Sequence, residues 1–115
     1  MFRGTVVHGD KLGRAFGYRT ANLDISIKET KCKSGVYAAQ ATLLRKKYKS
    51  ALIINSARDK VEVHLFQYKG PEFYGKVMTV DPIQKVSEIE KHDNEADLKA
   101  KIEDDITLVR KVLKL

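Results

Sequence analysis

The hydrophobic pattern of this sequence changes its period once, and that change restricts the fold more than any other feature. Over roughly the first ninety residues, apolar and polar residues alternate in short runs separated by turns, namely 2–8, 35–43, 50–55, 61–66 and 73–80. Leu23, Ile25 and Ile27 alternate in the same way. Short alternating runs with turns between them are typical of antiparallel strands that close, or nearly close, into a barrel.

From Leu98 onward, apolar residues recur every three or four positions, which is the period of an α-helix. The stripe comprises Leu98, Ile102, Ile106, Val109 and Leu113, with Leu108 as an alternative neighbour of Ile106. Asp93 or Asn94 can cap this helix, because a short side-chain oxygen accepts hydrogen bonds from the free N–H groups of the first turn. We expect a helix of about 20 residues that packs on the barrel; a partner helix docking on the stripe is the alternative.

The length of 115 residues suits a single domain, with a barrel over 1–92 and a helix over 93–115. No apolar run is long enough to span a bilayer, and no signal-peptide pattern precedes the first strand. Cys32 is the single cysteine, so an internal disulfide is excluded and a cytoplasmic location is expected. We expect a monomer with no membrane partner.

The net charge of +7 arises in the first half of the chain. Residues 1–50 hold 11 of the 22 basic residues and 3 of the 15 acidic ones, whereas residues 51–92 hold 6 of each. A local positive field favours an anionic partner, either a nucleotide or a nucleic acid. The basic run 45–47 is assigned to an exposed hairpin tip. Nucleic-acid binding is disfavoured, because aromatic residues are only 8% of the chain and do not alternate with basic ones.

The stretch between residues 4 and 23 is the best candidate for binding phosphate and a metal ion. Three glycines at intervals of four are interspersed with basic residues: Gly9, Lys11, Gly13, Arg14 and Gly17. Glycines let the backbone approach a ligand closely, and consecutive free N–H groups form an anion-binding nest. Thr20 and Asn22 follow on an extended segment, so they share a face and offer oxygen ligands that Mg²⁺ accepts. Taken alone, these features also fit an ordinary loop and a hydrogen-bonding pair at a strand start.

Glu62 lies within a strand pattern, 61–66, that is otherwise largely apolar. A carboxylate among apolar neighbours is costly unless it is paired or functional. Glu62 is therefore a candidate general base for a hydroxyl nucleophile. The alternative is that its face, shared with His64, points to solvent, and His64 itself is interpreted as a structural or surface residue.

Taken together, these residues resemble the riboflavin kinase family. The matching segments are Gly4-x-Val6-x-x-Gly9-x-x-x-Gly13-Arg14-x-x-Gly17-Tyr18-x-Thr20-Ala21-Asn22-Leu23, Gly35-Val36-Tyr37-Ala38, Val61-Glu62-Val63-His64-Leu65-Phe66, Phe73-Tyr74-Gly75-Lys76, and Leu98, Ile102 and Asp105-Ile106. The resemblance covers nearly the whole chain and implies a six-stranded antiparallel Greek-key barrel with a C-terminal helix.

The resemblance also implies an activity and assigns roles. It implies Mg²⁺-dependent transfer of the ATP γ-phosphate to the 5′-hydroxyl of riboflavin, giving FMN and ADP. The glycine-rich loop would then hold the ATP phosphates, Thr20 and Asn22 would serve the Mg²⁺–nucleotide, and Glu62 would accept the proton of the ribityl hydroxyl.

The sequence departs from the family pattern at three places. Arg19 replaces the proline that precedes Thr-Ala-Asn in the family. A short turn over 55–60 stands in place of a Gly-x-x-Pro-Thr segment, and Ser87 and His92 stand where the family has Arg-x-x-x-x-Phe. The last two regions belong to the flavin side, so Glu62, Ser87 and His92 are the flavin-binding candidates. A non-catalytic domain that binds flavin or nucleotide is the alternative reading, and FAD synthesis is not expected because no His-x-Gly-His motif is present.

Overall fold

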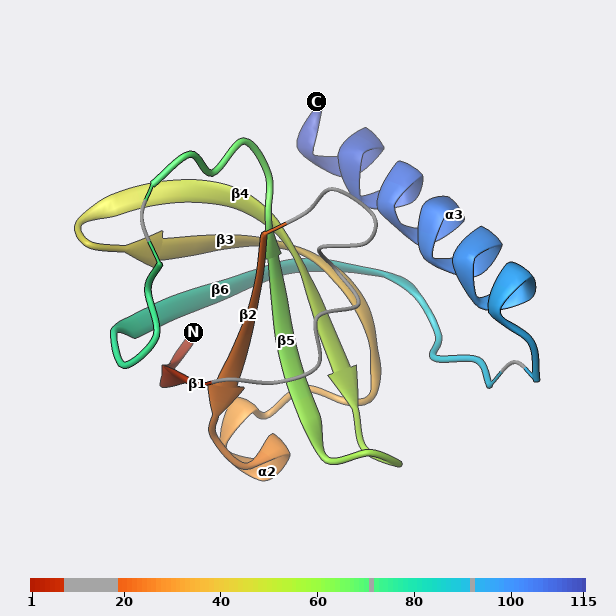
Figure 1. Cartoon of the computed structure of the whole chain (residues 1–115), viewed down its shortest axis with the longest axis horizontal. Coiled ribbons are helices and arrows are strands. Elements are labelled where there is room, and N and C mark those ends of the chain that lie inside the picture. Colours follow the sequence, from red (N-terminus) through yellow and green to blue (C-terminus); the bar gives the residue numbers. More distant parts are fainter. Residues whose placement is uncertain (8–18, 71, 92) are drawn as a thin grey trace.

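The computed structural model describes residues 1–7, 19–70, 72–91 and 93–115, which form a closed barrel of six strands with a long helix against its side (Figure 1). The strands are β1 (Phe2–Val7), β2 (Arg19–Asp24), β3 (Gly35–Leu43), β4 (Lys46–Asn55), β5 (Lys60–Leu65) and β6 (Val77–Ser87). The helices are α2 (Ile27–Thr30) and α3 (Glu95–Leu113). The predicted fold class, an antiparallel barrel with a C-terminal helix, is confirmed.

Neighbouring strands pair antiparallel around the barrel in the order β1-β2-β5-β4-β3-β6. The chain leaves β2 for β3, and β5 for β6, without pairing the two strands that it connects. Such long connections between hairpins are the mark of Greek-key topology. Because the barrel closes, each of these six strands has a partner on both edges, and their relative positions are tightly determined.

Alternate side chains of the strands fill the barrel interior, as the period-two pattern predicts. Ala21, Ala39 and Ala41 are fully buried there, beside larger Leu, Ile, Val and Met side chains. This mixture of small and large residues lets six strands close on a filled interior. The intervening side chains point outward, where they are free to build a site.

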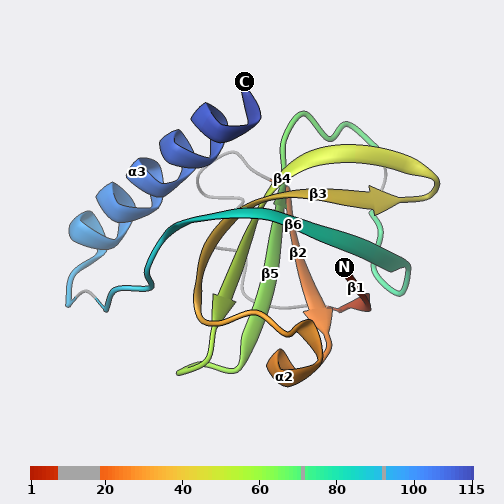
Figure 2. The ribbon, with the colours of Figure 1, turned by 180° about the vertical axis from the view of Figure 1, so that it is seen from behind.

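A second core lies outside the barrel, beneath α3. Figures 1 and 2, which view the molecule from opposite sides, both show α3 alongside the barrel and away from the tip of the β3–β4 hairpin. The apolar stripe of α3 packs on the outer faces of the strands. The buried members of this second core are Val36, Ala38, Ala51 and Phe66 from the barrel and Ile106, Val109 and Leu113 from the helix. Leu108 is 41% exposed and lies off the stripe. The expected docking of the helix on the barrel is confirmed.

Polar contacts fix both ends of α3. Of the two candidate caps, Asn94 is the one used: its side chain accepts a 2.8 Å hydrogen bond from the N–H of Asp97. At the other end, Lys49 Nζ on β4 donates to the carbonyl of Leu113 over 3.0 Å. A cation at the carboxyl end of a helix also complements the helix dipole. Among the described residues, no helix has both the length and the hydropathy to cross a bilayer.

Two predicted strands have wrong boundaries: the end of the strand at 23–27 and the start of the strand at 73–80. The alternation at Ile25 and Ile27 does not extend β2, which ends at Asp24; Ser26 instead caps the short helix α2. Both isoleucines pack against the interior core, so their spacing reflects burial and not a strand. Similarly, Phe73, the predicted start of the last strand, lies before β6. It is 3% exposed because it packs in the interior core and against the rings of Tyr68 and Tyr74.

The remaining differences concern how far strands extend. β4 begins at Lys46, before the predicted 50, and β6 continues to Ser87, beyond the predicted 80. The added residues mix polar side chains with Tyr48, Ile83 and Val86 and carry no regular alternation, because strand pairing requires only the backbone. The exposed hairpin tip expected at 45–47 is confirmed: Leu44 and Arg45 have φ of 51° and 68°, as a two-residue turn between antiparallel strands requires.

Candidate functional site

The outer faces of β2 and β5 bring four polar side chains together. In the antiparallel ladder Asn22 lies opposite Glu62, and Thr20 lies opposite His64. Residues opposite one another on the same face have Cβ atoms roughly 4.5–5.5 Å apart. The four side chains point outward because Ala21, between Thr20 and Asn22, fills the barrel interior. The barrel therefore sets the spacing of this polar group.

Two oxygens of this group have no hydrogen-bond partner among the described residues. Thr20 Oγ1 and Asn22 Oδ1 are buried, and within the described parts of the chain neither takes part in a hydrogen bond. A buried polar atom left unsatisfied costs roughly 1–3 kcal/mol, so a ligand that supplies the partner is favoured. Hydroxyl and amide oxygens are hard ligands of the kind that Mg²⁺ accepts together with phosphate oxygens. The donor chemistry at this position fits a divalent cation bound with a nucleotide.

Further metal ligands of the usual types do not gather here. Over residues 1–7, 19–70, 72–91 and 93–115, no group of three or more His, Cys, Asp or Glu side chains is arranged to hold a metal ion. Thr20 and Asn22 therefore suit an ion whose remaining ligands come from a bound substrate or water, as is usual for Mg²⁺ in nucleotide sites.

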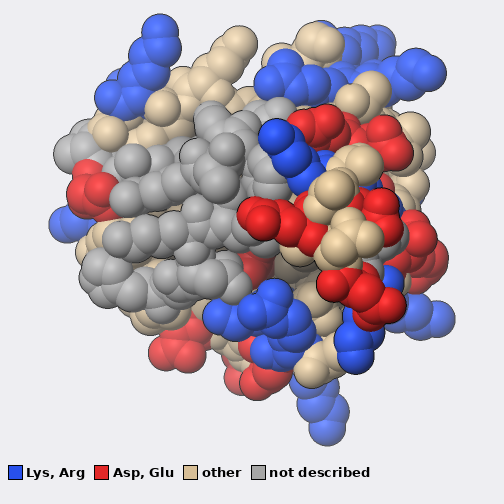
Figure 3. All heavy atoms as spheres, turned by 45° about the vertical axis from the view of Figure 1, so that its right-hand side comes forward, with Lys and Arg blue, Asp and Glu red and all other residues tan. Residues whose placement is uncertain are grey.

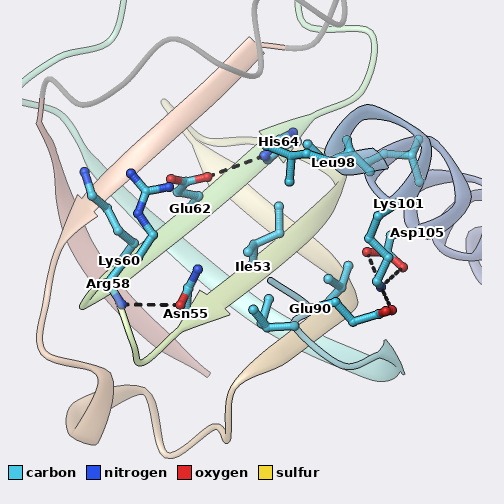
Figure 4. A pocket seen from close by; sticks show the side chains of 14 residues that line it. Ile53, Asn55, Arg58, Lys60, Glu62, His64, Glu90, Leu98, Lys101 and Asp105 are labelled. Carbon is cyan, nitrogen blue, oxygen red and sulfur yellow. Dashed lines mark hydrogen bonds and ion pairs between the residues drawn. The ribbon is translucent and has the colours of Figure 1, made fainter. Parts of the chain in front are cut away.

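Glu62 is only partly accessible, with 17% of its side chain exposed. Its Oε2 lies 3.9 Å from Nε2 of His64, whose side chain is 5% exposed (Figure 4). The expectation that this face could point to open solvent is therefore wrong: the face is outside the barrel but covered. The role of Glu62 as a general base stays a prediction. Its partial exposure leaves the carboxylate accessible to a ligand.

A pocket lies beside this face, between β4, β5 and α3. Its volume is about 130 Å³, and Glu62 and His64 form part of its wall (Figure 4). Apolar side chains from both the barrel and the helix side line it: Val36, Ile53, Ile89, Leu98, Ile102 and Ile106. The same helix that closes the second core thus also completes the pocket.

At one end of the pocket lies the short turn between β4 and β5. The side chain of Asn55 accepts a 3.3 Å hydrogen bond from the N–H of Arg58, and Ser34 Oγ accepts a 2.9 Å bond from the N–H of Ser56. Figure 4 shows Arg58 and Lys60 extending along the same side of the pocket as Glu62. The shortened turn therefore places two cationic side chains beside the candidate base.

At the helix side, Lys101 is the centre of a polar cluster. Its Nζ donates to both carboxylate oxygens of Asp105, at 2.6 and 2.7 Å, and to Ser87 Oγ at 2.5 Å. Glu90 Oε2 lies 3.5 Å from the same nitrogen. Lys101, Asp105 and Glu90 all line the pocket, whereas Ser87 is not among its lining residues. The flavin contact predicted for Ser87 stays a prediction; in the structure Ser87 is joined to the pocket wall through its hydrogen bond with Lys101.

The surface over α3 is rich in carboxylates. Figure 3 shows Asp and Glu side chains gathered on the face that this view brings forward, with Lys and Arg at its margins. Four acidic residues of α3 are exposed, namely Glu95, Asp97, Glu103 and Asp104. None of these four lines the pocket, whose helix side carries Lys101 together with Asp105 and Glu90.

Several predicted site residues cannot be placed. The glycine-rich loop residues Gly9, Lys11, Gly13, Arg14 and Gly17, and also His92, lie outside the described residues, so their roles stay predictions. Conversely, the sequence pattern did not single out Lys101, and Asp105 entered only as part of a matching segment without a role. A basic and an acidic residue four apart beside the apolar stripe form one ion-paired row on a helix, and this spacing is the signal that could have found them.

The sequence matches a known family over nearly its full length. A family model described as "Flavokinase: Riboflavin kinase" covers residues 1–113. The bifunctional riboflavin kinase/FMN adenylyltransferase of Haemophilus influenzae is 33% identical over 110 residues, which are 90% of this chain and 35% of that protein. The chain spans between 33% and 50% of the length of the curated relatives that it matches.

Solved structures share the arrangement of barrel and helix. A crystal structure of riboflavin kinase from Trypanosoma brucei superposes with a TM-score of 0.68 over 97% of this chain and 75% of that one, at 23% identity. A crystal structure described as a macrolide-efflux protein from Streptococcus pneumoniae gives a TM-score of 0.76 over 94% of this chain and 35% of that one, at 26% identity. The fold is therefore a recurrent one.

Proposed function

The chain belongs to the riboflavin kinase family, and on this premise we propose that it transfers the γ-phosphate of ATP to the 5′-hydroxyl of riboflavin. The observation that carries the proposal is the grouping of Thr20, Asn22 and Glu62 on one outer face, beside the pocket that Glu62 lines. Phosphoryl transfer depends mainly on positioning and charge neutralisation. A metal-binding pair, a base and an acceptor pocket within one rigid barrel suit that chemistry.

We assign the flavin to the pocket between the barrel and α3. Its apolar walls, such as Ile53 from β4 and Ile102 from α3, suit the two faces of a flat ring system. The ribityl chain then extends from the helix side toward Glu62, which lines the same pocket.

Glu62 is assigned the role of general base. It accepts the proton of the 5′-hydroxyl while that oxygen bonds to the γ-phosphorus and the bond to the ADP oxygen breaks. Glu62 lies opposite Asn22, which is assigned to the nucleotide, and it also lines the pocket assigned to the flavin. The buried imidazole of His64, 3.9 Å away, limits where the carboxylate can move.

Thr20 and Asn22 are assigned to a divalent cation, proposed to be Mg²⁺, that binds with ATP. Their buried oxygens, without partners in the described residues, support this assignment because the ion would supply the missing contact. Such an ion neutralises charge on the transferred phosphoryl group. The glycine-rich loop, including Lys11 and Arg14, remains our candidate for holding the phosphates.

The proposal is tested by incubating the purified chain with riboflavin, ATP and Mg²⁺ and separating the flavins by chromatography. We expect FMN to accumulate with equimolar ADP, and to disappear when ATP is omitted or when a chelator removes the metal. Isothermal titration calorimetry with ADP–Mg²⁺ and with riboflavin separates binding from turnover.

The outcomes distinguish the alternatives. Binding of both ligands without FMN would support the non-catalytic flavin- or nucleotide-binding domain. Failure to bind either ligand would contradict both readings. Binding of riboflavin with equal FMN formation in chelator would contradict the role assigned to Thr20 and Asn22 while leaving the pocket assignment standing.

A further inference from the structure

Lys101 joins α3 to the stretch that follows β6, and Figure 4 shows its contacts with Asp105 and Glu90 at the helix side of the pocket. We propose that Lys101 is a positioning residue for the flavin: it holds the segment 87–90 against α3 and so fixes the pocket wall away from Glu62. This inference rests on the proposed function, because it names a determinant of flavin binding at the same site. It assigns a role to a residue that no motif in the sequence singled out.

The hydrogen bonds of Lys101 reach outside its own helix. An ammonium group has three protons to donate. Asp105, one turn further along α3, takes contacts of 2.6 and 2.7 Å, while Ser87 Oγ at the end of β6 lies at 2.5 Å. Glu90, beyond the strand, adds a carboxylate oxygen at 3.5 Å. A single side chain therefore connects the helix, the end of a barrel strand and the segment that follows it.

The ion pair at the centre of this cluster is largely buried, whereas Glu90 is 58% exposed. The side chains of Lys101 and Asp105 are 13% and 10% exposed. Interactions between charges are screened less when they are removed from water, and a buried charge that loses its partner is strongly destabilising. The pair is thus unlike an exposed i,i+4 ion pair, which contributes little.

The segment that Lys101 holds has few other constraints. Between the end of β6 at Ser87 and the cap of α3 at Asn94, the described residues form no helix or strand. The ion pair of Lys85 with Glu88, at 2.7 Å, joins this stretch to β6 and does not tie it to α3. Ile89 packs on the second core, so Lys101 supplies the polar half of the attachment.

Pocket residues flank the connection on both sides. Ile89 and Glu90 line the pocket from the irregular segment, and Ile102 and Asp105 line it from α3. If the segment moves away from the helix, the apolar wall formed by Ile89 moves with it. The flavin should therefore lose affinity, whereas the nucleotide, assigned to Thr20 and Asn22 on β2, should not.

The sequence supports the same reading. The family resemblance places an arginine at the position of Ser87, and this chain carries no cation there. Lys101 Nζ lies 2.5 Å from Ser87 Oγ and 2.6 Å from Asp105 Oδ1. A cation from the helix thus occupies a position that a long basic side chain at 87 could also reach.

The test begins with Lys101→Met, which keeps an unbranched four-atom side chain and removes the terminal ammonium group. We expect the riboflavin KM to rise on the order of tenfold, with the KM for ATP changed less than about twofold. The matched control is Lys111→Met on an exposed position of the same helix, which should change neither. Lys101→Arg should retain most of the riboflavin affinity, since it keeps a donor cation.

Two double variants separate positioning from simple charge balance. Lys101→Met with Asp105→Asn removes the uncompensated carboxylate, and we expect it to recover thermal stability but not the riboflavin KM. Lys101→Met with Ser87→Arg places a guanidinium within reach of Asp105 from the strand end, and we expect it to recover both. If the first double variant restores riboflavin affinity as fully as the second, Lys101 only balances a charge and the inference is wrong.

Riboflavin binding is also measured directly, by quenching of flavin fluorescence without ATP. Equal dissociation constants for the wild type and Lys101→Met would overturn the inference even if FMN is made. Conversely, riboflavin binding that Lys101→Met weakens, in a chain that makes no FMN, would support the inference and contradict the proposed kinase activity. If Lys101→Met alone does not fold, the comparison of the two double variants decides the matter.

Discussion

The outer face of β2 and the inner face of α3 differ in how their polar atoms are paired. On β2, Thr20 Oγ1 and Asn22 Oδ1 are buried without hydrogen bonds to described residues. On α3, Lys101 bonds to both Asp105 oxygens and to Ser87. Strands paired on both edges can hold unsatisfied atoms in place, whereas a helix joined by an irregular segment needs side-chain contacts to stay in position. The first arrangement suits ligand binding, and the second maintains the shape of a wall.

The largest effect is expected for Glu62→Gln, which removes the candidate base between these two faces. General-base catalysis contributes about 100- to 10,000-fold, so we expect kcat to fall within that range while binding of ADP–Mg²⁺ changes little. Steady-state kinetics and calorimetry measure the two quantities. Glu103→Gln on the exposed side of α3 is the control. Full activity of Glu62→Gln would show that another group takes the proton.

Next in size is Ile106→Ala, which weakens the helix side alone. Ile106 is 3% exposed and contributes to both the second core and the pocket. Truncation of a buried isoleucine costs about 2–5 kcal/mol of unfolding free energy, measured by urea denaturation, and we expect weaker riboflavin binding. Leu108→Ala, at a position 41% exposed on the same helix, should cost much less. An equal loss of nucleotide affinity in the folded variant would contradict the separation of the two sides.

Thr20→Val tests the β2 side, and here binding and stability should move in different directions. Loss of the hydroxyl should weaken ADP–Mg²⁺ binding by about tenfold, because an assigned oxygen ligand is removed. The ligand-free protein should be as stable as the wild type or more so, since an unsatisfied buried group disappears. Calorimetry and thermal unfolding measure the two effects, with Thr5→Val on an exposed position of β1 as the control. A clear loss of stability in Thr20→Val would show that its hydroxyl is satisfied in the protein.

The smallest effect is expected for Asn94→Ala at the start of α3. Loss of the cap to the N–H of Asp97 should cost about 1 kcal/mol of unfolding free energy. Nucleotide affinity should be unchanged, because the helix contacts the other side of the pocket. Asp93→Ala, at the alternative cap position suggested by the sequence, should have almost no effect. The reverse order of the two variants would place the helix start one residue earlier.

The sequence predicted elements whose pattern follows directly from local burial. β3 and β5 were found because each alternates between two environments, the barrel interior and an outer face. The isoleucines of 25–27 misled the prediction, because two partly buried side chains at a spacing of two are compatible with a strand end followed by a helical turn. The ends of β4 and β6 were missed because backbone pairing extends over residues that carry no regular alternation.

The candidate site was only partly predictable for a related reason. Thr20, Asn22 and Glu62 were found from residue type, spacing and family resemblance, but that Asn22 lies opposite Glu62 follows from the register of β2 and β5. The pocket wall from α3 could not be placed, because nothing in the helix pattern says which strands the stripe covers. Lys101 in particular acquires meaning only beside Ser87, 14 residues away in the chain.

The sequence by itself therefore determined a barrel, a terminal helix and the side chains able to serve a nucleotide, because periodicity and residue chemistry are local properties. Only the tertiary structure decided that Glu62 is covered without being buried in the core, and that Lys101 ties the chain after β6 to the helix. Both outcomes depend on register and docking between segments distant in the chain, and such contacts arise only when the barrel closes and α3 packs on its outer face.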